Sequence, residues 1–293
     1  MYDGNRTIDL HAHTTASDGD HAPAQLVALA ARLGLTALAV TDHDTTAGLA
    51  EAIEAGRREG VEIVPGVELS AEFPRGQCHI LGFFVEPDAP ELCIRLQQVR
   101  DNRNRRNALI IGRLNELGIA VTIEEVQREA DGDVVARPHF ARVLVSRGVV
   151  SNIQEAFDRF LAKGASAYVD RDRLTPQESI DLIHSAGGIA VIAHPKLMRR
   201  EAADTEVEIA RLQEMGMDGI EARYNLHDAE ETARYLALAE RLGMVTSGGS
   251  DYHGPTLRPS VQLGHVEGHQ PAPTALLADL KSARPAARPA TNP

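Results

Sequence analysis

Short apolar runs that end in a histidine or a carboxylate recur along this chain. The first run, Ile8 to Leu10, is followed directly by His11. Later apolar runs end in the same manner at Asp42-His43, Glu68, His194 and Asp251-x-His253. Side chains that follow parallel strands meet at one end of an α/β barrel, where such barrels form their active sites. The pattern therefore predicts an α/β barrel with a polar site at its strand ends.

Helical patterns alternate with these apolar runs. Residues 20–33, 45–59, 175–187, 204–215 and 229–242 read as helices, several of them stopped by glycine. Residues 67–73 and 78–85 instead predict a β-hairpin, with a turn over residues 74–77. His79 precedes its apolar run, unlike the other motif residues, and the hairpin would bring it back toward Glu68.

The alternation stops after Pro87 and resumes after Asp170. Residues 91–117 read as one long helix, and the pattern from 121 to 163 is again helical, without a strand that ends in a motif. We interpret residues 100–167 as a mainly helical inserted subdomain that covers the site, between barrel parts at 1–99 and 168–270. The tail at 271–293 is rich in proline and arginine near its end, and we expect it to be disordered.

Composition indicates an ordinary soluble globular protein. Hydrophobic residues make up 43% and charged residues 25% of the 293 residues. Cys78 and Cys93 provide no disulfide framework, and neither a membrane-length apolar run nor a signal-peptide pattern is found. We therefore expect a cytoplasmic protein that does not bind membranes.

The net charge of −12 argues against binding of duplex DNA, which calls for a basic surface. It does not exclude an anionic substrate, because bound divalent metals would place positive charge at the site itself.

His11 and His13 would point to the same face of a strand, and Asp18 follows in a loop of small polar residues. Two imidazoles with a nearby carboxylate suit a divalent transition metal better than a packed core. Two incidental histidines near a strand end are the alternative. A ligand set of nitrogen and oxygen without thiolate allows Mn, Fe or Zn.

Taken together, the motifs resemble those of the PHP (polymerase and histidinol phosphatase) family, in the same order along the chain. The resemblance implies a distorted (β/α)7-type barrel, two or three divalent metal ions, with Mn favoured over Fe or Zn, and hydrolysis of phosphate esters. By the resemblance, His11, His13, Glu68 and Asp251 would hold the first metal. Glu68 would bridge to a second metal, bound also by His79 and His194. The third would be held by Asp18, His43 and His253.

Basic and polar residues elsewhere are candidate substrate contacts. In the insertion, Asn107, Arg137, His139 and Lys163 carry donors for a phosphate, and arginine suits this role best because its planar fork binds two oxygens. At the barrel mouth the candidates are Lys196, Arg223 and Asn225. For any single one of the insertion's arginines, a solvated helix face is the competing interpretation.

The favoured function is a metal-dependent phosphatase. The insertion, with Ala136-Arg137-Pro138-His139-Phe140, resembles the PHP subgroup that removes the 3'-phosphate from nucleoside 3',5'-bisphosphates, such as adenosine 3',5'-bisphosphate, giving AMP. A hydroxide bridging two metals on Glu68 and Asp251 would attack phosphorus, and Asp42 would orient its neighbour His43.

Three other functions compete with this one. They are a 5'-3' exoribonuclease acting on short RNA, a metallohydrolase of a C–N or carboxylic ester bond, and a non-catalytic metal-binding domain. The unbroken ligand set argues against the last, and the basic residues at the mouth favour phosphate over a neutral amide.

Overall fold

The computed structural model describes residues 7–74, 76–130, 135–170, 173–199, 201–266, 268 and 270–284. These residues form two compact units. Unit 1 contains the chain up to Ile94 and again from Leu174, and unit 2 consists of Arg95–Arg173. The sequence interpretation drew the insertion at 100–167, somewhat inside the limits of unit 2.

Unit 1 is built on one sheet with the strand order β7-β6-β5-β4-β3-β2-β1-β8. β4 pairs antiparallel with β3 and β5, β8 pairs antiparallel with β1, and the remaining pairs are parallel. The strands are β1 (Thr7–Ala12), β2 (Leu35–Val40), β3 (Glu62–Ala71), β4 (Cys78–Phe83), β5 (Ile189–Ile192), β6 (Gly219–Tyr224), β7 (Val245–Gly249) and β8 (Ala272–Pro273). The predicted hairpin is confirmed as β3 and β4, with Ser70 opposite His79.

The sheet curves into a nearly closed barrel, because the segment after β7 returns to β1. Ala12 forms an isolated parallel bridge with Tyr252, and His13 N donates a hydrogen bond of 2.9 Å to Tyr252 O. Gly249 permits this approach, since a Cβ at that position would overlap the backbone N and the Cβ of His11. Closure places the end of β1 beside the end of β7, and the predicted barrel architecture is confirmed.

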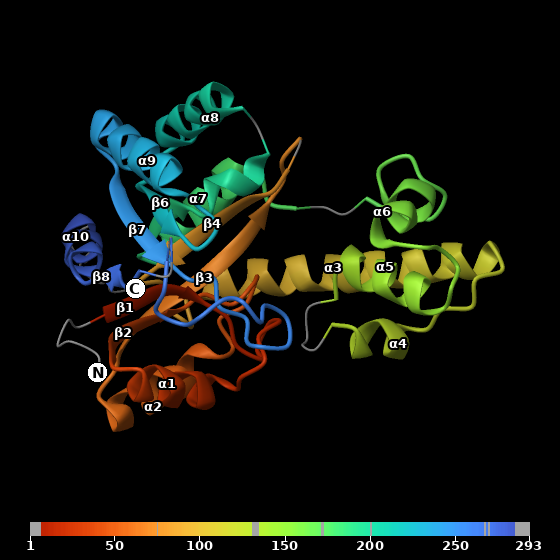
Figure 1. Cartoon of the computed structure of the whole chain (residues 1–293), viewed down its shortest axis with the longest axis horizontal. Helices are drawn as coiled ribbons and strands as arrows, with labels where there is room; N and C mark the ends of the chain where they lie inside the picture. The colour runs from red at the N-terminus through yellow and green to blue at the C-terminus, as the bar shows by residue number, and fades with distance from the viewer. Residues whose placement is uncertain are drawn as a thin grey trace. The chain divides into compact units, whose positions relative to one another are not determined.

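Helices surround the sheet of unit 1, with α1 (Pro23–Arg32) and α2 (Leu49–Glu59) side by side (Figure 1). The others are α7 (Pro176–Ser185), α8 (Ala202–Glu214), α9 (Ala229–Leu242) and α10 (Ala275–Ala283), with a 3-10 turn η2 at Pro195–Met198. The predicted start of α7 is confirmed: Thr175 Oγ1 accepts a hydrogen bond from Glu178 N, and Glu178 Oε2 accepts one from Thr175 N.

The disorder expected from residue 271 is not found over the first part of the tail, where the structure forms β8 and α10. Leu276, Leu277 and Leu280 of α10 are buried in an apolar core cluster of unit 1. The proline and arginine of residues 284–289 predict disorder, but leucines at helical spacing precede them and form the buried face of α10. Residues 285–293 lie outside the described part of the chain.

Unit 2 is helical and has its own core. The long helix α3 (Pro90–Glu116) begins in unit 1 and continues into unit 2. It is followed by α4 (Ile123–Arg128), α5 (Arg137–Ser146), α6 (Ile153–Ala156) and a π-helical turn η1 (Phe157–Leu161). Ile110, Leu114, Phe140, Leu144 and Phe160 are among the side chains buried in its separate apolar cluster. The mainly helical character of the insertion is as the sequence predicts.

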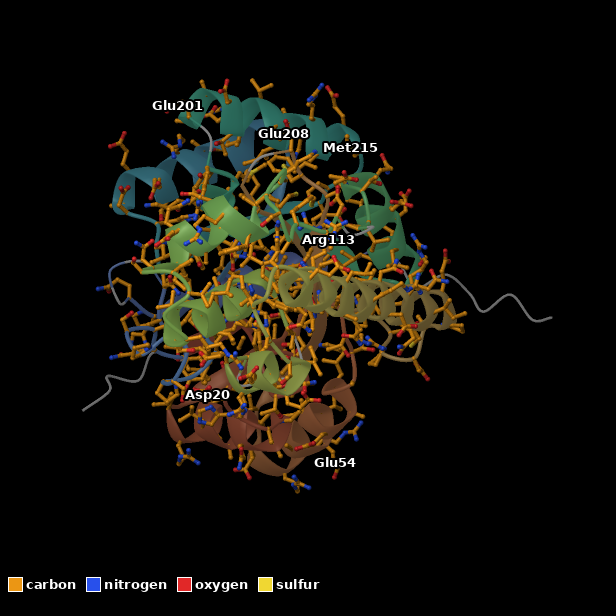
Figure 2. All side chains as sticks on the ribbon, turned by 90° about the vertical axis from the view of Figure 1, so that its right-hand side faces the viewer. Asp20, Glu54, Arg113, Glu201, Glu208 and Met215 are labelled. Atoms are coloured by element: carbon orange, nitrogen blue, oxygen red, sulfur yellow. The ribbon has the colours of Figure 1, made fainter. Side chains whose placement is uncertain are left out.

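Acidic side chains on the outer elements account for part of the net negative charge. Glu54 in α2 and Glu201 before α8 are exposed (Figure 2). Within the described residues, no helix has the length and apolar character needed to cross a membrane.

Candidate metal centre

Three groups of potential metal ligands lie at the strand ends of unit 1. Within each group, one ligand atom per residue lies within 4.8 Å of every other. The groups are His11, His13, Glu68 and Asp251; His43, Glu68 and His79; and His13, Asp18, His43 and His253. Of the predicted ligands, His194 stands outside these groups, but its Nε2 lies 2.9 Å from Glu68 Oε1.

Glu68 is the residue around which the groups are arranged, and its carboxylate is fully buried. Its Oε1 lies 2.9 Å from both His79 Nδ1 and His194 Nε2. Its Oε2 lies 3.3 Å from His11 Nε2, 3.2 Å from His13 Nε2 and 3.0 Å from His43 Nδ1. The two oxygens thus face different histidines, an arrangement that suits a carboxylate shared by two metals.

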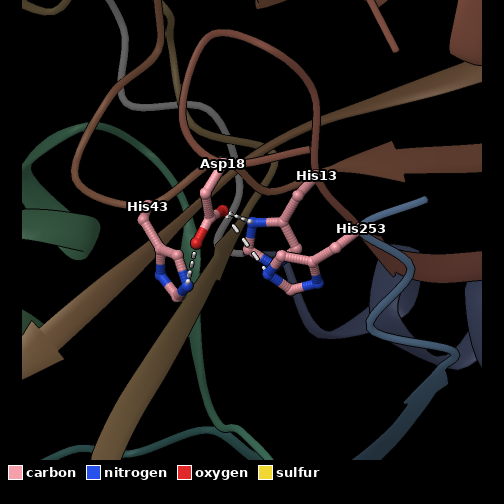
Figure 3. A group of neighbouring side chains, drawn as sticks. All are labelled: His13, Asp18, His43 and His253. Atoms are coloured by element: carbon pink, nitrogen blue, oxygen red, sulfur yellow. Dashed lines mark ion pairs between the residues drawn. The ribbon is translucent and has the colours of Figure 1, made fainter. Parts of the chain in front are cut away.

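Asp18 faces three histidines, two of which also face Glu68 (Figure 3). Its Oδ1 lies 3.6 Å from His13 Nδ1 and 3.4 Å from His253 Nε2, and its Oδ2 lies 3.8 Å from His43 Nε2. The resemblance assigned His13 to the first metal alone, whereas its two ring nitrogens face different groups here. His43 likewise lies between Asp18 and Glu68.

The chemistry of these atoms fits divalent metals. Within the described chain, several buried ligand atoms have no hydrogen-bond partner: His11 Nε2, both ring nitrogens of His13, His43 Nδ1, Glu68 Oε2 and His194 Nδ1. Buried polar atoms nearly always have a partner, so a concentration of unpartnered nitrogen and oxygen atoms calls for one. Mixed imidazole and carboxylate ligation is what Mn, Fe and Zn accept.

Burial and opposite charge shift the protonation of the ligands strongly. Burial opposes charge on His13, but the carboxylates of Asp251, Glu68 and Asp18 outweigh it and raise the pKa of His13 to about 10. For His43 burial prevails and lowers its pKa to about 3. Burial also opposes ionisation of Glu68 and Asp251, yet neighbouring positive charge, from histidines and Arg258, holds both carboxyl pKa values well below their usual range. Metal binding would displace the proton that His13 holds.

Two buried carboxylates that the sequence analysis did not single out hold ligands in position. Glu221 Oε1 lies 2.9 Å from His11 Nδ1, and Glu221 Oε2 accepts a hydrogen bond of 2.6 Å from His194 N. Asp9 accepts hydrogen bonds from His11 N at 3.1 Å, Ser250 N at 3.0 Å and Gly264 N at 2.7 Å. A carboxylate behind a ligand histidine fixes which nitrogen faces the metal. The sequence offered one signal for Asp9, namely its position two residues before His11 on the same strand.

Asp42 also holds neighbouring residues in position and does not face the ligand atoms itself. Its Oδ1 accepts hydrogen bonds from Thr14 N at 2.8 Å and Ser17 Oγ at 2.6 Å, and its Oδ2 accepts one from Thr14 Oγ1 at 2.8 Å. Among the described residues, it belongs to none of the three ligand groups. Asp42 therefore fastens the loop that carries Asp18, a more indirect role than orienting the His43 ring.

Backbone strain is concentrated at this site. His194 and Asp251, two of the predicted ligands, have positive φ values of 28° and 54°, and Asp44 beside His43 has a φ of 51°. Such conformations are unfavourable for residues other than glycine and persist where the surrounding structure imposes them, often at functional sites.

The substrate contacts expected in unit 1 already have partners within the protein. Lys196 Nζ donates to Leu226 O at 2.8 Å and to Glu231 Oε2 at 2.7 Å. Asn225 Nδ2 donates to Ser250 O, and thereby ties the end of β6 to the segment that carries Asp251. Arg223 is half-buried in β6 and also has an interaction within the protein.

The candidates in unit 2 differ from one another in exposure. Lys163 is exposed. His139 is buried, and its Nδ1 accepts a hydrogen bond from Ala136 N, which caps its own helix. Arg137 is half-buried and donates to Leu161 O at 3.1 Å, with its guanidinium over the ring of Tyr168. Asn107 is buried and donates to Val135 O.

Unit 2 also holds a group of arginines around Arg106, which we call the arginine cluster: Arg103, Arg106, Arg137 and Arg173. Arg106 is only 5% exposed, and its Nε has no hydrogen-bond partner among the described residues. Burial and the positive charges of Arg137, Arg103 and Arg173 lower its pKa to about 9. The sequence indicated a helix rich in arginine, but helical spacing could not show which arginines turn inward.

The chain is similar to known proteins over most of its length. A family model described as the PHP domain matches residues 9–215. A 5'-3' exoribonuclease, Rnm, of Escherichia coli is 38% identical over 90% of this chain and 91% of its own length. A 3',5'-nucleoside bisphosphate phosphatase of Chromobacterium violaceum is 35% identical over 89% of this chain and 91% of its own.

Solved structures also align over nearly the whole chain. One of them is that of an amidohydrolase from Chromobacterium violaceum with bound sulfate and no metal, 34% identical in sequence. The alignment covers 96% of this chain and 99% of that chain, with a TM-score of 0.79.

Proposed function

Because the chain belongs to the PHP domain family of metal-dependent phosphoesterases, we propose that it removes the 3'-phosphate from nucleoside 3',5'-bisphosphates, with adenosine 3',5'-bisphosphate as the representative substrate. The observation that carries the reaction type is the convergence of buried histidines and carboxylates on Glu68. The choice of substrate is supported by the Chromobacterium violaceum relative at 35% identity, which is named a 3',5'-nucleoside bisphosphate phosphatase. The arginine cluster of unit 2 has the chemistry to bind a phosphate group.

The residues at the metal centre would have two kinds of role, holding the metals and holding the ligands in position. Glu68, Asp251 and the motif histidines would hold the metals, with Glu68 shared, while Glu221 fixes His11 and His194 and Asp42 fixes the loop of Asp18. Divalent metals bound there would neutralise charge on the phosphate oxygens and make water a usable nucleophile near neutral pH.

The arginine cluster calls for an anion. An arginine with a pKa of about 9 remains charged at neutral pH, so several positive charges lie together in a largely buried setting. Burial of charge is costly, and for Arg137 the nearby Tyr168 and Asp170 offset that cost only in part. A phosphate would satisfy the guanidinium donors in pairs and neutralise their charge. By its chemistry, the cluster in unit 2 therefore suits a phosphate group.

A comparison of kcat/KM on different substrates tests the proposal. Initial rates should be measured on adenosine 3',5'-bisphosphate, 3'-AMP, a short 5'-phosphorylated RNA and p-nitrophenyl phosphate, with release of phosphate and of nucleotide followed separately. We expect the highest kcat/KM on the bisphosphate, with AMP and phosphate as products. Phosphate release from 3'-AMP as efficient as from the bisphosphate would show that no second phosphate is recognised.

A 5'-3' exoribonuclease is the second candidate function, because the Escherichia coli relative at 38% identity carries that name. Such an enzyme would also find a 5'-phosphate useful for recognition. It would release mononucleotides from the RNA with a kcat/KM equal to or above that on the bisphosphate, and this outcome would replace our proposal.

Loss of the guanidinium of Arg137 should weaken use of the bisphosphate selectively. A charge-assisted contact to phosphate contributes about 1.5–3 kcal/mol, so Arg137→Ala should lower kcat/KM on the bisphosphate roughly 10- to 150-fold. The loss on p-nitrophenyl phosphate, which has no second phosphate, should be far smaller. Arg106→Gln should give the same selective loss.

Arg159→Ala is the matched control, because Arg159 pairs with Glu155 on the surface of the same unit. This variant should have the same kcat/KM as the wild type on both substrates. Equal losses on both substrates in the Arg137 variant would place that residue in the fold or at the reacting phosphate, and no loss on either would remove it from substrate binding.

A further inference from the structure

Asp251 presents its two carboxylate oxygens to two different environments. Oδ1 faces the ligand histidines and lies 3.5 Å from His11 Nε2, 3.3 Å from His13 Nε2 and 3.4 Å from His253 Nδ1. Oδ2 points away from them. It accepts a hydrogen bond of 3.0 Å from the hydroxyl of Tyr224 and forms an ion pair with Arg258 Nη1. One oxygen is therefore engaged by protein donors before any metal is considered.

Both donors are themselves held in place. Tyr224 ends β6, is fully buried, and its ring centroid lies 5.4 Å from that of His194. Arg258 belongs to the loop after β7, where its backbone N donates to Gly254 O at 3.0 Å and its backbone O accepts from Val261 N at 3.0 Å. The same loop is tied to the loop of Asp18, since Thr256 N donates to Asp20 Oδ2 at 2.7 Å.

We propose that Arg258 and Tyr224 are positioning residues that restrict Asp251 to a single metal-facing oxygen, Oδ1. With Oδ2 held by a hydroxyl and a guanidinium, the carboxylate cannot turn to offer both oxygens to one metal. The inference rests on the proposed metal centre and adds to it two residues that belong to none of the ligand groups of the described chain.

The pair acts on charge as well as on direction. The guanidinium neutralises part of the Asp251 carboxylate, so Oδ1 donates less charge than a free carboxylate would. Groups that hold a metal-binding carboxylate from behind contribute to ligand orientation, and their loss typically costs roughly 10- to 100-fold in metal affinity or activity. Arg258 suits this role because its Nη1 meets the Asp251 carboxylate and also lies 3.5 Å from the Tyr224 hydroxyl oxygen.

Binding of Co²⁺ tests the inference without reference to turnover. The wild-type protein and the variants Arg258→Ala, Arg258→Lys and Tyr224→Phe should be freed of metal and titrated with Co²⁺. Affinity and the visible absorption spectrum, which responds to the ligands around the ion, are both recorded. Arg258→Ala should bind its tightest Co²⁺ roughly 10- to 100-fold more weakly and with an altered spectrum. Arg258→Lys should recover part of both, because it restores the charge, and Tyr224→Phe should show a smaller loss.

Arg241→Ala is the control, since Arg241 is 56% exposed and pairs with Glu206 in the same unit. It should titrate like the wild type. Circular dichroism of each metal-free variant separates loss of metal binding from loss of the fold, and Tyr224→Phe keeps the packing of the ring should Arg258→Ala fail to fold. Wild-type affinity and spectrum in Arg258→Ala and Tyr224→Phe alike would overturn the inference but leave the metal centre standing. A wild-type protein that binds no Co²⁺ would overturn both.

Discussion

The Glu68→Gln variant is expected to lose at least ~100-fold in kcat on any phosphate ester that the protein hydrolyses, the scale set by disturbing a metal centre and the groups around it. The substitution keeps the size of the side chain but removes its charge and replaces one acceptor oxygen with a donor. Glu68 Oε1 faces His79 and His194, and Oε2 faces His11, His13 and His43. An amide would therefore turn its N–H group toward one of these sets and an uncharged oxygen toward the other, which should weaken two metals at once.

Measurement of kcat should be paired with metal analysis of the same preparation. The variant should retain fewer equivalents of metal than the wild type, since the shared ligand is lost. Glu62→Gln offers a control on the same strand, because Glu62 begins β3 and pairs with Lys281 at the surface. Near-normal turnover in Glu68→Gln would remove Glu68 from the mechanism, whatever its effect on metal content.

Removal of metal should abolish turnover and lower thermal stability. Protein purified without chelator is expected to contain at least two equivalents of Mn, Fe or Zn, because any two of the three ligand groups share one residue, either Glu68, His13 or His43. A ligand present at a hundred times its Kd stabilises a folded protein by about 2.7 kcal/mol per site. Chelation should therefore lower Tm by several degrees, and addition of one of these metals should restore both Tm and turnover.

Comparison of the three metals in the restored protein would identify the one that supports hydrolysis best. The free enzyme lacks the positive charge that the metals provide, so its buried carboxylates would be balanced by protonated histidines such as His13, whose pKa is raised to about 10. Metal content below one equivalent in fully folded, active protein would contradict the metal centre.

The pattern of residues along the chain predicted the barrel and a polar site at its strand ends, and the family resemblance supplied the set of candidate ligands. A strand directs alternate side chains to one face, so His11 and His13 could be paired from spacing alone. The antiparallel pairing of β3 and β4 followed from two apolar runs joined by a short turn, which is why His79 could be expected near Glu68. These are local regularities, and a sequence records them directly.

Contacts between distant segments were decided by the tertiary structure. Glu221 lies 210 residues from His11, and no periodicity relates them, so its part in holding His11 could not be read from the chain. The same holds for the contacts of Tyr224 and Arg258 with Asp251 Oδ2. Lys196 and Asn225 were expected at the substrate, but the fold provides each with a partner of its own. The residue type shows that a side chain is able to bind a ligand. What it binds depends on its burial and its neighbours, and both are set only when segments far apart in sequence pack together.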